Sequence, residues 1–150
     1  MNTPEKSSDA GGDTRFLYVA WVVATTAMLM STFFSEVMHL PPCTLCWYQR
    51  ICLFPLVVIF AVGIVRRDEG VIAYALPLVL IGLGIATYHN LLYYGVIPET
   101  LSPCSQGVSC TEVQLRWLGF ITIPMLALAG FVTLTASLLA HHRSNQRSKT

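Results

Sequence analysis

Residues 71–94 read VIAYALPLVLIGLGIATYHNLLYY, and these 24 positions contain no Asp, Glu, Lys or Arg. A helix of that length extends about 36 Å, which exceeds the roughly 30 Å thickness of the hydrocarbon core of a bilayer. The run is too long for an ordinary strand, and it lacks the apolar–polar alternation of a membrane barrel. This segment therefore predicts a transmembrane helix.

Three further apolar runs of similar length lie on either side of it, at about 16–34, 47–65 and 118–140. Of the 150 residues, 54% are hydrophobic and only 11% are charged, whereas soluble domains carry about 25% charged residues. High hydrophobicity with a net charge of +1 excludes a disordered chain and argues against nucleic-acid binding, which relies on a basic patch. The sequence predicts an all-α membrane protein, a single domain over residues 1–150 with a bundle of four transmembrane helices.

Lys and Arg are distributed unequally between the two sides of this topology. Seven of the nine lie on the side that holds both chain ends and the connection between the second and third spans. Because positively charged segments stay in the cytoplasm, we expect the polar N-terminal tail (1–15) and the basic C-terminal tail (141–150) to be cytoplasmic. The connections at about 35–46 and 95–117 then lie on the extracytoplasmic face of the cell membrane.

Four of the five cysteines lie in these two outer connections, Cys43 and Cys46 in the first, Cys104 and Cys110 in the second. Disulfides persist in the oxidising space outside the cytoplasm, so two structural staples are one interpretation. The Cys-x-x-Cys spacing of Cys43 and Cys46 is more typical of redox chemistry, because it holds a low-pKa thiol beside a resolving thiol. Cys52, inside the second span, is expected to be a packing residue.

The Cys-x-x-Cys motif stands at the start of a predicted helix, because Pro41 and Pro42 precede it and the second span begins at about Cys46. The free N–H groups and the dipole of a helix N-terminus favour a thiolate. Arg50 follows Cys46 by four residues and so lies one turn further along the same face. We therefore expect Cys46 to be the low-pKa thiol. Arg50 then either anchors the membrane interface or meets an anionic partner.

An ionisable residue inside a membrane span is a functional candidate, and His89 lies near the outer end of the third span. It either donates a hydrogen bond to a bound cofactor or binds a carbonyl of a neighbouring helix. Four outer cysteines also match the ligands of a Cys₄ zinc site, but an oxidising space disfavours persistent thiolates. We expect no metal site.

The run PCTLCWYQR at 42–50, placed between the first two of four spans, resembles the DsbB family and is most similar to its BdbC type from Gram-positive bacteria. The specific motif is C-x-L-C-x-x-x-R, and the resemblance covers roughly residues 15–140. It implies a thiol:quinone oxidoreductase that re-oxidises an extracytoplasmic thioredoxin-fold thiol oxidase (DsbA or BdbD-like) and supports disulfide formation in exported proteins, a relay that keeps the bacterial periplasm oxidising. It favours menaquinone as the cofactor, with ubiquinone as the alternative.

The resemblance assigns the catalytic role to four cysteines: Cys43, Cys46, Cys104 and Cys110. It assigns quinone binding to three residues: Cys46, Arg50 and His89. The partner would attack an outer disulfide, most readily at its first cysteine, and the second cysteine would then attack the inner pair. Only five residues separate the outer cysteines here, whereas the best-known members have a long loop. A short loop restricts the travel of these cysteines, so which one meets the partner first stays open.

Two other classes of protein stay open as alternatives. One is a metal-binding membrane protein, and the other is a non-enzymatic membrane scaffold stapled by two disulfides. A scaffold would account for the cysteines. It would not account for Arg50 one turn after Cys46, nor for a Cys-x-x-Cys at a helix start.

Overall fold

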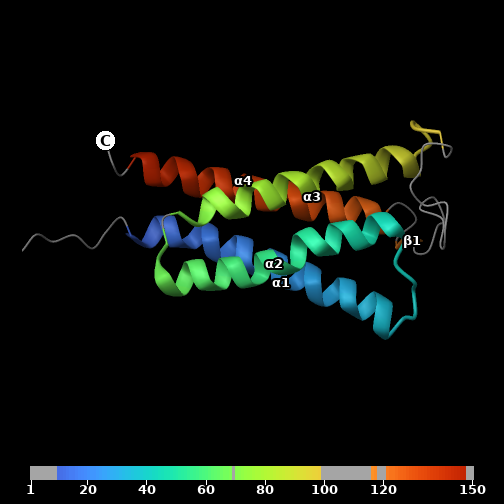
Figure 1. The fold of residues 1–150 in the computed structure, drawn as a ribbon, viewed down its shortest axis with the longest axis horizontal. Helices are drawn as coiled ribbons and strands as arrows, with labels where there is room; N and C mark the ends of the chain where they lie inside the picture. Colours follow the sequence, from blue (N-terminus) through green and yellow to red (C-terminus); the bar gives the residue numbers. More distant parts are fainter. Residues whose placement is uncertain (1–9, 69, 99–115, 118–120, 148–150) are drawn as a thin grey trace, which may run out of the picture.

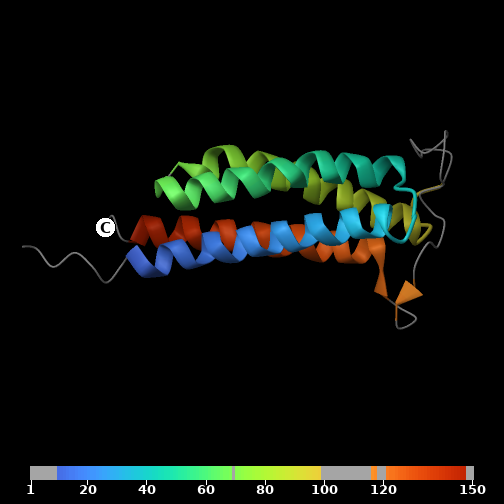
Figure 2. The same cartoon turned by 90° about the horizontal axis from the view of Figure 1, so that it is seen from below.

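The computed structural model describes residues 10–68, 70–98, 116–117 and 121–147. These residues form four long helices: α1 (Ala10–Glu36), α2 (Thr44–Arg66), α3 (Val71–Tyr93) and α4 (Ile123–Arg147). All four are long and apolar enough to cross a membrane, which confirms the prediction of a four-helix membrane bundle. Figure 1 and Figure 2 show the helices running side by side along one long axis.

The two ends of the bundle hold different parts of the chain. The start of α1, the α2–α3 connection and the end of α4 share one end, and the α1–α2 connection shares the other with the end of α3 and the start of α4 (Figure 1). The start of α2, where the Cys-x-x-Cys motif lies, is therefore on the end opposite the described chain termini. The cytoplasmic placement of those termini stays a prediction from the Lys and Arg distribution.

Two helices differ in their bounds from the expected spans. The first helix begins at Ala10, inside the segment expected as a polar tail, and the fourth continues to Arg147. The fourth helix also begins at Ile123, five residues later than expected, because the two-residue strand β2 (Ile121–Thr122) pairs antiparallel with β1 (Arg116–Trp117). Pro124 in the first turn suits such a start, since its missing N–H has no helical partner there.

The core is made from small and branched side chains of all four helices. Ala20 and Ala24 of α1 and Ala75 and Ala86 of α3 are fully buried, and small residues of this kind let transmembrane helices approach closely. Larger side chains complete the same cluster: Leu56, Phe60, Val79, Phe131, Leu134 and Leu138. Many outward-facing Val, Leu and Ile side chains are exposed, as expected for a surface that faces lipid.

Gly82 of α3 packs against the buried ring of Phe131 on α4. A Cβ at position 82 would lie 2.2 Å from Phe131 Cε1, whereas a Cβ at Gly84 would meet nothing within 4 Å. We expect Gly82→Ala to lower the free energy of unfolding by about 1–3 kcal/mol through overpacking. Gly84→Ala should keep or slightly raise stability, because Ala is the better helix former. Unfolding by SDS in mixed micelles measures both variants, and equal stabilities would contradict this packing.

Candidate functional site

Cys43 and Cys46 stand at the first turn of α2, as expected. Cys43 is the N-cap residue, with an extended backbone at φ −69° and ψ 168°, and its Sγ accepts a hydrogen bond from the Cys46 backbone N–H at 3.4 Å. This bond satisfies one of the free donors of the helix N-terminus. The donors of the first turn therefore favour Cys43.

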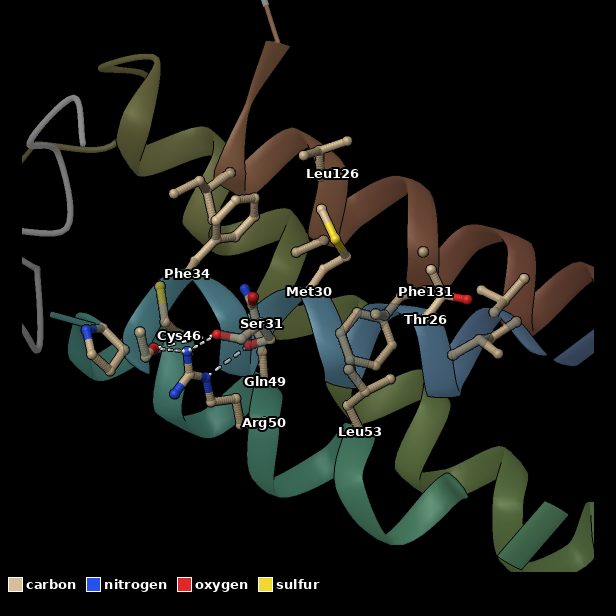
Figure 3. Close-up of a pocket in the computed structure, with 18 of the residues that line it drawn as sticks. Thr26, Met30, Ser31, Phe34, Cys46, Gln49, Arg50, Leu53, Leu126 and Phe131 are labelled. Carbon is tan, nitrogen blue, oxygen red and sulfur yellow. Dashed lines mark hydrogen bonds between the residues drawn. The ribbon is translucent and has the colours of Figure 1, made fainter. Parts of the chain in front are cut away.

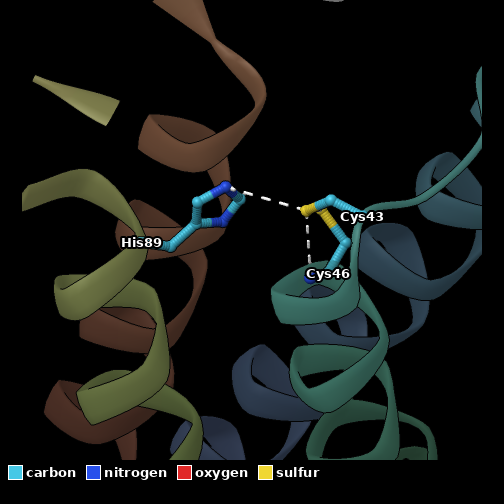
Figure 4. A group of neighbouring side chains, drawn as sticks. All are labelled: Cys43, Cys46 and His89. Carbon is cyan, nitrogen blue, oxygen red and sulfur yellow. Dashed lines mark hydrogen bonds between the residues drawn. The ribbon is translucent and has the colours of Figure 1, made fainter. Parts of the chain in front are cut away.

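The two sulfurs are in direct contact (Figure 4). Cys43 Sγ lies 2.8 Å from Cys46 Sγ, and both residues are free cysteines in this structure. Cys43 is buried and Cys46 is half-buried. A small approach of the two sulfurs would reach the roughly 2.05 Å of a disulfide bond, so the pair is close enough to join without refolding of α2.

The pKa of Cys43 departs from the expectation. Its hydrogen bond with the Cys46 thiol, together with the contacts from His89 and the Cys46 backbone N–H, lowers the pKa of the Cys43 thiol to about 4, although burial raises it. We expected the helix N-terminus to favour the Cys46 thiolate. That expectation is wrong for this reduced pair, chiefly because the hydrogen bond between the two sulfurs lowers the pKa of Cys43. The start of α2 at Thr44 adds the capping N–H bond to Cys43 as a smaller cause.

His89 of α3 faces the cysteine pair across the gap between α2 and α3 (Figure 4). Its imidazole is 2% exposed, and its Nε2 lies 3.8 Å from Cys43 Sγ. Its Nδ1 lies 3.4 Å from Nε2 of Gln49, a buried residue of α2. With that amide nitrogen as donor, Nδ1 is the acceptor of this hydrogen bond. The structure thus brings His89 to the cysteine pair, and its contact with a cofactor stays a prediction.

Arg50 is held by α1 (Figure 3). Its Nε donates to Ser31 Oγ at 2.8 Å, and its Nη2 donates to the Ser31 carbonyl at 2.7 Å and to Ser35 Oγ. The guanidinium also lies 5.4 Å from the ring centroid of Trp47, a favourable cation–π distance. Among the described residues, each hydrogen-bond partner of Arg50 is a neutral group. Within that part of the chain, none of these hydrogen bonds neutralises its positive charge.

A cavity of about 420 Å³ lies beside this arginine, between α1, α2 and α4 (Figure 3). Cys46, Gln49 and Arg50 line one part of it, together with Ser31 and Ser35. Most of the remaining wall is apolar: Val22, Val23, Ala27, Met30, Phe34, Leu53, Leu126, Ala127, Phe131 and Leu134. Neither Cys43 nor His89 belongs to this wall. The two sulfurs thus face different surroundings, Cys46 the cavity and Cys43 the imidazole.

Sequence reasoning did not single out Ser31, Ser35 or Gln49. The two serines are four residues apart near the outer end of an apolar span, a spacing that places both on one helix face. Their position as polar residues in a largely apolar segment was the signal that could have identified the two serines. Their contact with Arg50 depends on how α1 is rotated relative to α2, which the sequence does not determine.

The two outer cysteines, Cys104 and Cys110, lie outside the described residues, so their pairing stays a prediction. Cys52 is buried in the main core cluster. It packs among apolar side chains there, in the position expected of a structural residue.

Comparison with known proteins gives a consistent result. A family model described as "Disulfide bond formation protein DsbB" matches residues 13–141. The probable disulfide formation protein C 2 of Bacillus anthracis is 46% identical over 131 residues, covering 87% of this chain and 93% of that protein. Disulfide bond formation protein C of Bacillus subtilis (strain 168) is 44% identical over 119 residues, covering 79% and 86%. A probable disulfide formation protein of Chlamydia trachomatis serovar D is 44% identical over 129 residues, covering 85% and 93%. No solved structure matches the chain significantly.

Proposed function

This chain belongs to the DsbB family of disulfide bond formation proteins, and on that premise we propose that it is a thiol:quinone oxidoreductase of the cell membrane. It takes electrons from an extracytoplasmic thioredoxin-fold thiol oxidase and passes them to a membrane quinone. The observation that carries this proposal is the cavity at which Cys46 and Arg50 meet. A disulfide-stapled scaffold has no need of an apolar cavity with a thiol and a cation in its wall.

The cavity fits the chemistry of a quinone. Its volume of about 420 Å³ lies within the roughly 300–1,000 Å³ of small-molecule sites. A quinone has a flat apolar ring and two carbonyl oxygens, which become negatively charged on reduction. The apolar walls from α1 and α4 suit the ring and the start of its lipid tail, and the guanidinium of Arg50 suits a carbonyl oxygen.

When bound, the quinone supplies an acceptor for two electrons and two protons. Cys43 and Cys46 release the same number when their two thiols become a disulfide, so the exchange balances. Cys46 presents its sulfur to the cavity, and Cys43 remains in contact with it to close the bond. Arg50 stabilises negative charge on the acceptor, and the two serines of α1 keep its guanidinium in place.

Burial of the inner pair supports an entry step through the outer cysteines. Cys43 is only 5% exposed, so a folded partner protein would reach its sulfur with difficulty. A loop cysteine of the same chain could reach that sulfur without a second folded protein at the site. We assign this transfer to Cys104 and Cys110. The partner's two thiols become a disulfide, and the two electrons and two protons pass through the outer pair to the inner pair, from which Cys46 would deliver them to the acceptor that a bound quinone would supply. Menaquinone is the first quinone to test and ubiquinone the second.

The cysteine roles are tested by turnover. We expect Cys43→Ser and Cys46→Ser to abolish quinone reduction, because neither variant can form the inner disulfide. Cys104→Ser and Cys110→Ser should abolish it when the electrons come from a reduced thioredoxin-fold oxidase. Quinone absorbance, followed in detergent with purified partner, measures all four variants.

Cys52→Ala is the matched control, since it removes a thiol of the same helix that packs in the core. We expect its turnover to stay within about twofold of the parent, as for a packing cysteine. Full activity in either inner-pair variant would refute the relay. Normal partner oxidation in both outer-pair variants would refute the entry step.

The Arg50 contacts predict a graded effect on quinone binding. Loss of a hydrogen bond to a charged group costs about 1.5–3 kcal/mol, so Arg50→Ala should raise the quinone KM roughly 10–100-fold. Arg50→Lys should recover only part of this, because an ammonium lacks the planar fork that spans Ser31 and Ser35. Ser31→Ala should raise the KM less than Arg50→Ala does. Unchanged quinone kinetics in all three variants would reduce Arg50 to an interface anchor.

A further inference from the structure

Three potential metal ligands come together at the start of α2. The sulfurs of Cys43 and Cys46 and an imidazole nitrogen of His89 all lie within 4.8 Å of one another (Figure 4). Two thiolates and one imidazole are a donor set that holds Zn²⁺ with a fourth position left open. The quinone chemistry proposed above uses the two cysteines but gives this three-residue arrangement no role.

The distances are close to those of such a site. With Zn–S bonds of about 2.3 Å and Zn–N bonds of about 2.0–2.1 Å, tetrahedral geometry separates two sulfurs by about 3.8 Å and a sulfur from a nitrogen by about 3.5 Å. Cys43 Sγ and His89 Nε2 are already 3.8 Å apart. The sulfurs, at 2.8 Å, must separate by about 1 Å. Cys46 has room for this movement, because it borders the cavity.

The charges also balance. Two thiolates neutralise a divalent ion, and a neutral imidazole adds no charge, so the occupied site carries no net charge at the membrane edge. This matters because His89 and Cys43 are buried, and an uncompensated charge there would be costly. Binding removes the proton from any of the two sulfurs that still carries one and forms the neutral complex, with no change of oxidation state.

The contact of Gln49 with His89 is a second, independent observation that supports the site. A histidine that binds metal through Nε2 carries its proton on Nδ1, and that N–H usually donates to an oxygen that fixes the ring. Gln49 already lies 3.4 Å from Nδ1. Rotation of the Gln49 side-chain amide by about 180° places Oε1 instead of Nε2 next to Nδ1 of His89. This one side chain can therefore support either tautomer of His89.

We infer that Cys43, Cys46 and His89 of the reduced protein bind one Zn²⁺ or Cd²⁺ ion, and that the ion holds the protein in its reduced state. Both sulfurs are then occupied as ligands and cannot join as a disulfide. The oxidised pair offers no thiolate and should not bind. The inhibitory consequence rests on the proposed function, whereas the binding itself does not.

The binding is tested without quinone or partner. In a Cys104→Ser, Cys110→Ser background, the prereduced protein is titrated anaerobically with Cd²⁺, whose thiolate complexes absorb in the ultraviolet, and with Zn²⁺ in competition with a coloured chelator. We expect one ion per chain in the reduced protein and none at this site after oxidation. Cys46→Ser should remove the thiolate band, and Cys52→Ala should leave it unchanged.

The histidine and its support provide the decisive variants. Gln49→Leu removes the contact that supports His89 and should weaken metal binding roughly 10–100-fold. His89→Gln, which keeps a polar side chain at the position, should weaken metal binding at least as much. Affinity unchanged in both variants, or equal binding by the oxidised protein, would overturn the inference. So would turnover that Zn²⁺ leaves unaffected at saturating occupancy. Absence of turnover without metal would instead count against the proposed function and leave the binding result intact.

Discussion

The start of α2 is the constraint on which the rest of the site depends. Because the helix begins at Thr44, Cys43 caps its first turn and Cys46 lies within that turn. One sulfur then faces His89 of α3, and the other faces the cavity between α1, α2 and α4. Both remain in contact with each other. A change in the register of α2 by one residue would rotate the Cys46 sulfur by about 100° and away from these neighbours.

Arg50 is a charged residue whose hydrogen-bond partners among the described residues are all neutral. Ser31 and Ser35 accept hydrogen bonds from its Nε and Nη2 and so fix the plane of the guanidinium without neutralising it. A carboxylate in the same position would hold the side chain as firmly but would cancel the positive charge. Neutral partners therefore suit a cation that has to stabilise charge formed during a reaction, because the donors are aligned before that charge appears.

The sequence was sufficient for the features that depend on one helix at a time. The charge-free runs predicted four membrane helices, and two prolines before a Cys-x-x-Cys predicted a helix start with Arg50 one turn on. Features that depend on two helices were not predictable. The contact of Ser31 with Arg50 and that of His89 with Cys43 require the rotation of neighbouring helices. The sequence favoured the Cys46 thiolate. It did not reveal the direct contact between the two sulfurs, which is the largest cause of the lowered pKa of Cys43.

In the proposed reaction, the sulfur that faces the cavity delivers electrons to a quinone. Stopped-flow mixing of prereduced Cys104→Ser, Cys110→Ser protein with menaquinone, and then with ubiquinone, tests this step without any partner. We expect the loss of about one quinone per chain in a single turnover, since two thiols supply two electrons, together with formation of the Cys43–Cys46 disulfide. Folded protein whose inner thiols persist in the presence of both quinones would contradict it.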